Sequence, residues 1–304
     1  MLAALALVLP LALRAEEGGG ELSPDQPPAL WFPVGEQLVY KLYWGWIPVG
    51  KTRVITRWVQ EDGRRLLAIR YRTRSNAVIA KLYPVDDIIE SVIDPETFLP
   101  VRFIKNLKEG RHRYHEVTHF DHAAGKAHWY SIRKKKHKTY DINGDTRDLV
   151  SFMYFMRAQQ FEIGSETKYQ VMADEKLYEL IVNVDESETI KLPGFKKVPC
   201  LKVEPKAKFN GLFVRKGKMT LWVSEGERML CTRMAAKVPL ANVKAILTEV
   251  HGPGDDFWIR KTRRILKKRG DDADEEVEEA LKELDAERPE SLEVPDTAAG
   301  IPVP

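Results

Sequence analysis

Apolar and polar residues alternate along most of the chain between about residue 36 and residue 250. In one clear stretch, apolar residues occupy the odd positions, as Leu67, Ile69 and Tyr71, and arginines occupy the even positions 70, 72 and 74. Such alternation predicts a strand with one face in the core and one in water. Strands are expected near 38–43, 50–58, 67–74, 85–93, 100–107, 112–121, 126–133 and 137–142, and again near 166–174, 177–188, 198–206, 212–223, 228–236 and 243–250. Regular strand spacing of this kind is typical of a barrel or sandwich.

The stretch from Asp148 to Gln160 breaks the alternation and predicts a helix. Its apolar residues recur at the i, i+3, i+4, i+7 spacing of one helical face, as Leu149, Phe152, Met153 and Met156. Further apolar residues leave little polar surface, which predicts burial. Thr146 is the expected N-cap and Gly164 ends the pattern. The predicted fold is therefore mainly β: a curved antiparallel sheet forming a barrel or half-barrel around one buried central helix.

The N-terminal segment has the pattern of a signal peptide. Residues 2–13 are apolar apart from Pro10 and are followed by Arg14 and Ala15. This run is too short to span a bilayer but has the length of a signal-peptide core; a buried strand is the alternative. Residues 16–30 are rich in Glu, Gly and Pro and predict a disordered leader. We expect a signal peptide at 1–15, a β-rich envelope domain at 31–252, no later transmembrane segment, and a periplasmic or secreted location.

The composition changes after Gly252-Pro253-Gly254. Residues 255–269 are strongly basic, and residues 271–288 are strongly acidic with apolar spacing only at Val277, Leu281 and Leu284. Charge blocks of this kind favour solvent. We expect a charged tail at 253–304, partly helical and partly disordered, that adds little to the core. The exception would be residues 257–259, Phe-Trp-Ile, if they dock onto the sheet.

Composition and motifs indicate no catalytic chemistry. A formal net charge of +3 is too small to predict nucleic-acid binding, and we expect no nucleic-acid partner. The chain has no Gly-x-Ser-x-Gly elbow, no phosphate-binding glycine loop and no Cys-x-x-Cys motif. Asp86, Asp87 and Glu90 could supply the two carboxylates of a glycosidase, but acidic pairs are common in loops. We assign no catalytic residue and no cofactor.

Histidine is concentrated between residues 112 and 137, where six of the seven occur. They are His112, His115, His119, His122, His128 and His137. The first four have spacings that suit metal ligands on a helix, whereas this segment alternates as strands and places His112 and His122 opposite His115 and His119. We therefore expect polar residues on an outer face and no metal site.

Basic residues gather near a predicted hairpin turn. They are Arg133, Lys134, Lys135 and Lys136. A solvated loop is the favoured interpretation, and contact with an anionic surface, such as lipid headgroups, is the functional alternative.

The two cysteines are predicted to stay unpaired. Asn210-Gly211 is a strong hairpin signal. If the strands on either side of this turn pair, and the second also pairs with the strand that follows, Cys200 and Cys231 lie two strands apart on opposite faces of the sheet. Two strand spacings are roughly 10 Å, beyond the reach of a disulfide.

A diffuse pattern over about residues 33–250 resembles an uncharacterised bacterial envelope family, the domain of unknown function 3108. The matching positions are Gly35, Glu36, Tyr40, Gly50, Asp87, Glu90, Ser91, Asp94, Leu99, Pro100, Asp148, Ser151, Tyr154, Arg157, Gly164, Gly194, Trp222, Val223 and Ser224. The resemblance implies export and a β-rich fold, and it implies no activity. In architecture alone, the expected fold is also similar to half-barrel lipoprotein carriers.

We expect a non-enzymatic protein that binds an apolar or amphipathic envelope ligand, such as a lipid. The candidate ligand-binding residues are Trp44, Trp46, Phe152, Met153, Tyr154 and Arg157. Core packing is the alternative for the aromatic residues, and an ion pair with Asp87 or Glu90 is the alternative for the arginine. A structural or adaptor protein of envelope assembly and a hydrolase of envelope polysaccharide remain as other classes. A cavity beside the helix would favour the first class, a filled core the second, and paired carboxylates in a cleft the third.

Overall fold

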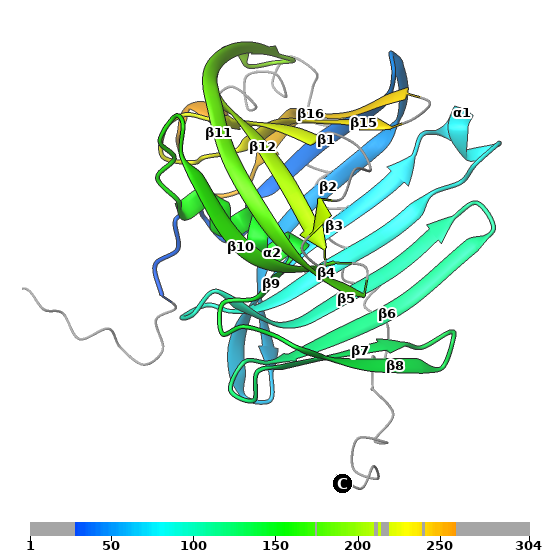
Figure 1. Cartoon of the computed structure of the whole chain (residues 1–304). Coiled ribbons are helices and arrows are strands. Elements are labelled where there is room, and N and C mark those ends of the chain that lie inside the picture. Colours follow the sequence, from blue (N-terminus) through cyan, green and yellow to red (C-terminus); the bar gives the residue numbers. More distant parts are fainter. Residues whose placement is uncertain (1–27, 174, 210–211, 214–218, 239–240, 260–304) are drawn as a thin grey trace, which may run out of the picture.

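The computed structural model describes residues 28–173, 175–209, 212–213, 219–238 and 241–259, and these form one large sheet with little helix (Figure 1). The fold is mainly β, as predicted. The expected signal peptide, most of the leader and the charged tail beyond Ile259 lie outside the described residues.

Fifteen strands follow one another in the sheet in the order β8-β7-β6-β5-β4-β3-β2-β1-β16-β15-β14-β12-β11-β10-β9, and β13 pairs with β12. The first half comprises β1 (Gln37–Trp44), β2 (Ile47–Glu61), β3 (Arg64–Ser75), β4 (Asp86–Asp94), β5 (Leu99–Glu109), β6 (His112–Asp121), β7 (Lys126–Ser131), β8 (Lys136–Asp141) and β9 (Arg147–Asp148). The second comprises β10 (Glu166–Ala173), β11 (Lys176–Leu192), β12 (Lys196–Phe209), β13 (Leu212–Phe213), β14 (Met219–Ser224), β15 (Cys231–Val238) and β16 (Ala241–His251). Neighbours are antiparallel except β9 and β10.

The predicted strands agree with the observed ones except in three places. The strand expected at 212–223 is divided into β13 and β14, and residues 214–218 between them are not described. The short strand β9 and the one-turn helix α1 (Ala77–Ala80) carry no periodicity and were not expected. The predicted turn at Asn210-Gly211 also lies outside the described residues, although β12 and β13 on either side of it pair antiparallel.

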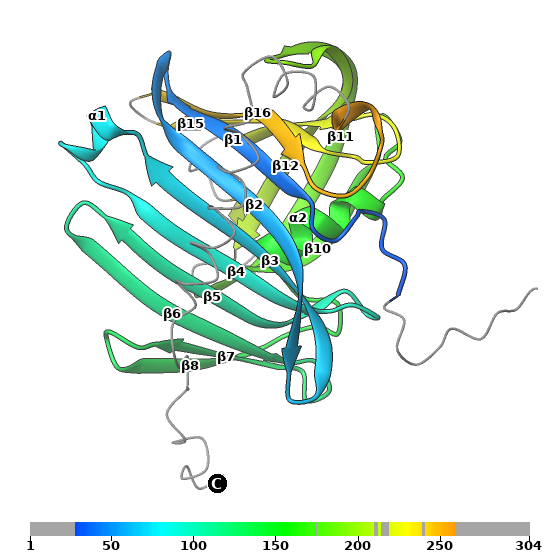
Figure 2. The ribbon, with the colours of Figure 1, turned by 180° about the vertical axis from the view of Figure 1, so that it is seen from behind.

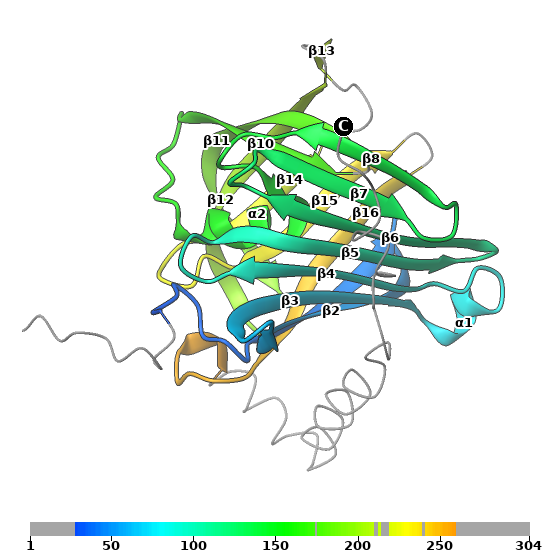
Figure 3. The same cartoon turned by 90° about the horizontal axis from the view of Figure 1, so that it is seen from below.

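The sheet is strongly curved but not closed. Among the described residues, β8 and β9 occupy its two ends and do not pair with each other. Side chains instead connect the β9–β10–β11 end of the sheet to strands of the opposite arm. Tyr140 Oη of β8 donates to the carbonyl oxygen of Glu175 at 2.9 Å, and Ser91 Oγ of β4 donates to Asp148 of β9 at 2.6 Å. Figure 2 shows the β1–β8 layer from its outer side, and Figure 3 shows its curvature from below.

The helix α2 (Leu149–Phe155) continues into the 3₁₀ turn η1 (Met156–Ala158) and packs against both halves of the sheet. Val150 and Tyr154 join a cluster with residues of β1 to β4, such as Leu67 and Ile69. Phe152, with Met156, joins a second cluster built mainly from β10, β11, β12 and β14. An apolar surface on several sides of the helix is therefore buried on several sides, as its sequence predicts.

The helix is shorter than predicted, and its cap is different. Asp148, not Thr146, is the N-cap, because its carboxylate accepts from the backbone N–H of Val150 at 2.7 Å and of Ser151 at 3.0 Å. The Thr146 hydroxyl instead donates to Gln170. The chain is already extended at Gln159, so the helical segment ends before the predicted limit.

The folded part extends beyond the predicted boundary at residue 252. Trp258 and Ile259 are only 6% and 2% exposed and belong to the largest core cluster. The ring centroids of Trp258 and Phe195 are 4.9 Å apart, and Asp256 accepts from the N–H groups of Trp258 and Ile259. The expectation that residues from 255 onward add little to the core is therefore wrong for 256–259, because two large apolar side chains outweigh the charged residues that follow.

Both cysteines are free thiols. Cys200 on β12 and Cys231 on β15 are separated by β14, as expected. Cys200 lies opposite Ser224, and Cys231 lies opposite Val223.

Candidate functional site: an apolar cavity beside the helix

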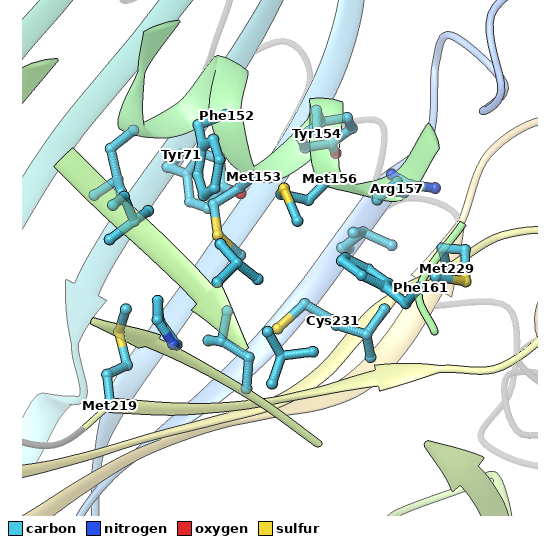
Figure 4. Close-up of a pocket in the computed structure, with 18 of the residues that line it drawn as sticks. Tyr71, Phe152, Met153, Tyr154, Met156, Arg157, Phe161, Met219, Met229 and Cys231 are labelled. Carbon is cyan, nitrogen blue, oxygen red and sulfur yellow. The ribbon is translucent and has the colours of Figure 1, made fainter. Parts of the chain in front are cut away.

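A cavity lies between α2 and the strands that face it (Figure 4). It holds about 770 Å³ of space free of atoms, part of which is open to solvent. The helical face that the sequence spacing predicted lines it in full, through Leu149, Phe152, Met153 and Met156. The apolar repeat of the helix therefore faces a hollow as well as a packed core.

The opposite wall is also apolar and comes from the second half of the sheet. Its residues are Leu180 and Val182 of β11, Val203 and Pro205 of β12, and Leu221 and Val223 of β14. Four methionines contribute to the lining, at positions 153, 156, 219 and 229. Unbranched, polarisable thioether side chains adapt to irregular shapes more readily than branched ones.

The remaining wall carries hydroxyl and thiol groups that stay neutral. Burial raises the pKa of the hydroxyls of Tyr40, Tyr71 and Tyr154 well above the ordinary value. Burial also raises the pKa of the Cys231 thiol to about 12, so this thiol is not a nucleophile at neutral pH. Tyr40 Oη donates to the carbonyl oxygen of Cys231 at 2.9 Å, which fixes β1 to β15 beside the cavity.

Arg157 borders the cavity, but its guanidinium is fully engaged by the protein. Nη1 and Nη2 donate to the two carboxylate oxygens of Glu36 at 2.6 and 3.0 Å, and Nε donates to the carbonyl oxygen of Arg228 at 3.0 Å. Arg228 also donates to Glu36, and to Asp256 at 2.6 Å. Tyr154 Oη donates to Glu36 at 3.3 Å. Two arginines and two carboxylates thus form one buried polar cluster with no formal net charge.

The electrostatics of this cluster hold Glu36 ionised. Burial alone would raise the pKa of Glu36, but the positive charges and hydrogen bonds of Arg157 and Arg228 outweigh burial and lower it. Burial alone would lower the pKa of Arg157, but the negative charge and hydrogen bonds of Glu36 outweigh burial and raise this pKa. The opposite charges of the cluster therefore compensate each other, and Arg157 is held by Glu36 within the protein.

A second polar group supports the start of the helix. Asp148 accepts from Ser91 Oγ at 2.6 Å and from Ser151 Oγ at 2.9 Å, in addition to the two backbone N–H groups that it caps. Burial raises the pKa of Asp148 and outweighs these hydrogen bonds. This group fixes α2 to β4 and so positions the cavity-lining face.

The predicted ligand-binding residues divide into two sets. Phe152, Met153, Tyr154 and Arg157 line the cavity. Trp44 and Trp46 do not: they lie at the β1–β2 turn, and Trp46 is 84% exposed. An aromatic turn has the same sequence pattern whether it borders a cavity or extends into solvent.

The predicted alternative for Arg157, an ion pair with Asp87 or Glu90, is wrong in its partner. Glu90 lies on the outer face of the sheet and accepts from Arg70 at 2.6 Å. Asp87 accepts from the backbone N–H of Lys108 at 2.8 Å. The true ion-pair partner is Glu36, which Arg228 shares, and it was not identified from the sequence. Glu36 is part of the family pattern, and its place in that pattern was the one sequence signal that could have indicated its role.

The histidines and the other possible metal ligands do not come together into a site. Within the described part of the chain, no cluster of three or more His, Cys, Asp or Glu side chains is suited to hold a metal ion. His122 Nε2 lies 3.1 Å from the carbonyl oxygen of Pro100, and His128 Nδ1 lies 3.1 Å from Thr139 Oγ1. Among the same residues, no helix is long and apolar enough to cross a bilayer.

The fold and the cavity define a barrel-like β protein. A crystal structure described as a beta-barrel-like protein of domain of unknown function DUF1849, from Brucella abortus, matches with a TM-score of 0.50 at 12% identity, over 73% of this chain and 98% of that chain. The likeness shows the fold alone. The family model described as protein of unknown function, DUF3108, matches residues 39–248, and the chain belongs to this family. No curated protein matches its sequence.

Proposed function

We propose that this protein is an exported, non-enzymatic binder that holds the apolar part of an envelope ligand in the cavity beside α2. The observation that carries the proposal is the lining itself: the predicted helical face and the facing strands border one apolar hollow beside the packed core. Small-molecule sites are concave and mostly apolar, as this lining is.

The lining favours a flexible apolar group over a polar substrate. The curved sheet and the helix border this apolar space, and a chain-like ligand would lie between the helix and β11, β12 and β14. The four methionines can move to admit such a ligand at low cost, since thioether side chains repack readily. An acyl chain or a similar group fits this chemistry.

The polar groups favour a neutral head over an acidic one. Arg157 is compensated by Glu36, so an anion placed beside it would have to compete with an existing bidentate pair. The hydroxyl of Tyr71, neutral at physiological pH, is the better candidate to orient a ligand. We therefore place Arg157 in the scaffold of the site.

The same lining disfavours a hydrolase. The described residues that line the cavity include no Asp and no Glu, whereas glycoside hydrolysis needs two carboxylates across the substrate. The Cys231 thiol is neutral and has no adjacent base in the lining.

Native mass spectrometry of protein purified from the envelope tests the proposal directly. We expect a bound species that is released on unfolding and extracts into organic solvent. In parallel, the neutral fluorescent probe N-phenyl-1-naphthylamine should bind to delipidated protein. Met153→Trp, which fills the cavity, should weaken probe binding about tenfold or more. The control Ile163→Trp, at a side chain that is 61% exposed and outside the lining, should not.

Two results together would refute the binder: a bare protein mass, and equal probe binding by the wild type and Met153→Trp. If the cavity binds no ligand, a structural or adaptor role becomes the better explanation of the fold.

A further inference from the structure

Large hydrophobic side chains are exposed mainly at one end of the sheet. Of the ten such side chains in the described residues, six lie on two neighbouring connections: Trp44, Trp46, Ile47, Val78, Leu82 and Tyr83. Trp46 and Leu82 are 84% and 86% exposed. A seventh, Ile132, lies on the β7–β8 turn at the same end. Only three of the ten lie elsewhere, so the exposed hydrophobic residues are concentrated in one place.

These connections are fixed to each other. Asn76 Nδ2 donates to the carbonyl oxygen of Pro48 at 2.6 Å, which joins the β3–β4 connection to the β1–β2 hairpin. The N–H of Gly110 donates to the carbonyl oxygen of Pro84 at 2.8 Å, which adds the β5–β6 turn. Because β1 to β8 are sequential antiparallel strands, alternate turns fall at one end, and Figure 1 shows α1 and the β5–β6 and β7–β8 turns along the right-hand side. The exposed residues therefore sit on a rigid rim.

The connections that form this rim carry basic residues and no acidic ones, although Asp86, Asp87 and Glu109 lie at the strand ends beside them. The β7–β8 turn carries Arg133, Lys134 and Lys135 next to Ile132, all of them exposed. Lys81 precedes Leu82, and Arg111 lies in the β5–β6 turn. Lysine is depleted at protein–protein interfaces, whereas basic segments are attracted to anionic lipid. Tryptophan and tyrosine prefer the boundary between headgroups and acyl chains.

We propose that this rim docks on the surface of an anionic phospholipid bilayer, with Trp46 and Leu82 entering the headgroup boundary and the β7–β8 turn contacting lipid phosphates. This inference does not rest on the proposed ligand, because it uses none of the residues that line the cavity. It gives the exposed Trp44 and Trp46 a role at a surface, and it joins them with the basic run into one interface.

Co-sedimentation of the full chain with vesicles tests this. Binding should be weak on phosphatidylcholine, rise when phosphatidylglycerol is added, and fall with increasing salt. The double variant Trp46→Ser/Leu82→Ser should lose about tenfold or more in affinity, since each removed side chain forfeits the burial of a large apolar group. Ile163→Ser, equally apolar and well exposed outside the rim, should bind like the wild type.

A charge pair of variants separates lipid attraction from general basicity. Arg133→Glu/Lys136→Glu should weaken binding to anionic vesicles by about fivefold or more for each residue changed. Lys191→Glu/Lys197→Glu makes the same change in net charge on β11 and β12 and should have little effect. The proposal fails if the chain binds no vesicles. It also fails if both rim variants bind like the wild type, as they would if residues 2–13 were responsible.

Discussion

Glu36 and Arg157, 121 positions apart in the chain, form a buried bidentate ion pair with side chains that are 0% and 6% exposed. Through Arg228 the pair is connected to Asp256, and through Arg157 to the end of the helical segment. The first strand, the helix, the β14–β15 connection and the last described residues therefore meet at one carboxylate. Such a group stabilises a fold only while every member is present, because each charge depends on the others for compensation.

Glu36→Gln should destabilise the protein strongly. The amide leaves two guanidinium groups buried without their shared carboxylate, and breaking a buried pair in this way costs about 3–5 kcal/mol. Urea unfolding followed by tryptophan fluorescence measures this change. Asp141→Asn, which removes the exposed partner of Lys126, should cost under about 1 kcal/mol. Equal effects of the two variants would show that the buried cluster adds nothing beyond a surface pair.

Period-two alternation made most of the strands predictable, because a half-buried strand is a local pattern. The same holds for the helical face at Leu149, Phe152, Met153 and Met156, which is where the cavity was found. The sequence also carried the family pattern, which the comparison confirms. These features depend on neighbours a few residues apart.

The features that sequence could not predict depend on distant neighbours. Nothing local couples Glu36 to Arg157, and strand parity alone could have excluded Glu90, which lies opposite Arg70 on the outer face. Trp258 and Ile259 lie next to a charged segment in the sequence. Their burial depends on core residues that are distant in the chain, so the local sequence does not distinguish them from solvated residues. Helix length was overestimated because the α-helix tightens into a 3₁₀ turn at Met156 and the chain becomes extended at Gln159.

Asp148→Ala should cost more stability than an ordinary helix cap. An N-cap is worth about 1 kcal/mol, and this carboxylate also satisfies two buried hydroxyls, from Ser91 and Ser151. We expect a loss of about 2–4 kcal/mol, with weaker probe binding because α2 loses its attachment to β4. Asn76→Ala is the control, because Asn76 caps α1 through the same pair of backbone positions at a partly exposed site, where it also donates to the Pro48 carbonyl oxygen. It should cost about 1 kcal/mol. A smaller loss for Asp148→Ala than for Asn76→Ala would contradict the role assigned to Asp148.

Truncation should separate the docked residues from the tail. Ending the chain after Gly254 removes Trp258 and Ile259 from the core, and losing even one such side chain typically costs about 3–5 kcal/mol. We expect a large fall in melting temperature by calorimetry. Ending the chain after Ile259 should change it little, since the removed residues include long basic and acidic blocks that favour solvent. Phe257→Ala, at a half-exposed neighbour, is the control for Trp258→Ala. The assignment fails if the two truncations melt alike.

Asp87 should make stability depend on pH between about 4 and 7. Burial raises the pKa of Asp87 most, the hydrogen bond from the Lys108 N–H lowers it, and repulsion by Glu109 and Asp86 raises it, to about 6. Because the folded state holds this proton more tightly than the unfolded chain, the contribution of Asp87 is fully present below its ordinary pKa near 4. That contribution is lost as the pH rises through 6. Stability relative to Asp87→Asn, which is neutral at every pH, should therefore fall over this range.

The expected fall is on the order of 1 kcal/mol, because solvent screening of a partly exposed carboxyl reduces the full effect. Urea unfolding of the wild type and Asp87→Asn at several pH values measures it, and NMR titration of the Asp87 carboxyl gives the midpoint. Glu109→Gln removes one repelling charge and should move that midpoint toward the ordinary value. If the stability difference stays flat from pH 4 to pH 8 while both proteins remain folded, then the pKa of Asp87 is the same in the folded and unfolded states. Asp86, Asp87 and Glu109 would then be an ordinary solvated acidic group.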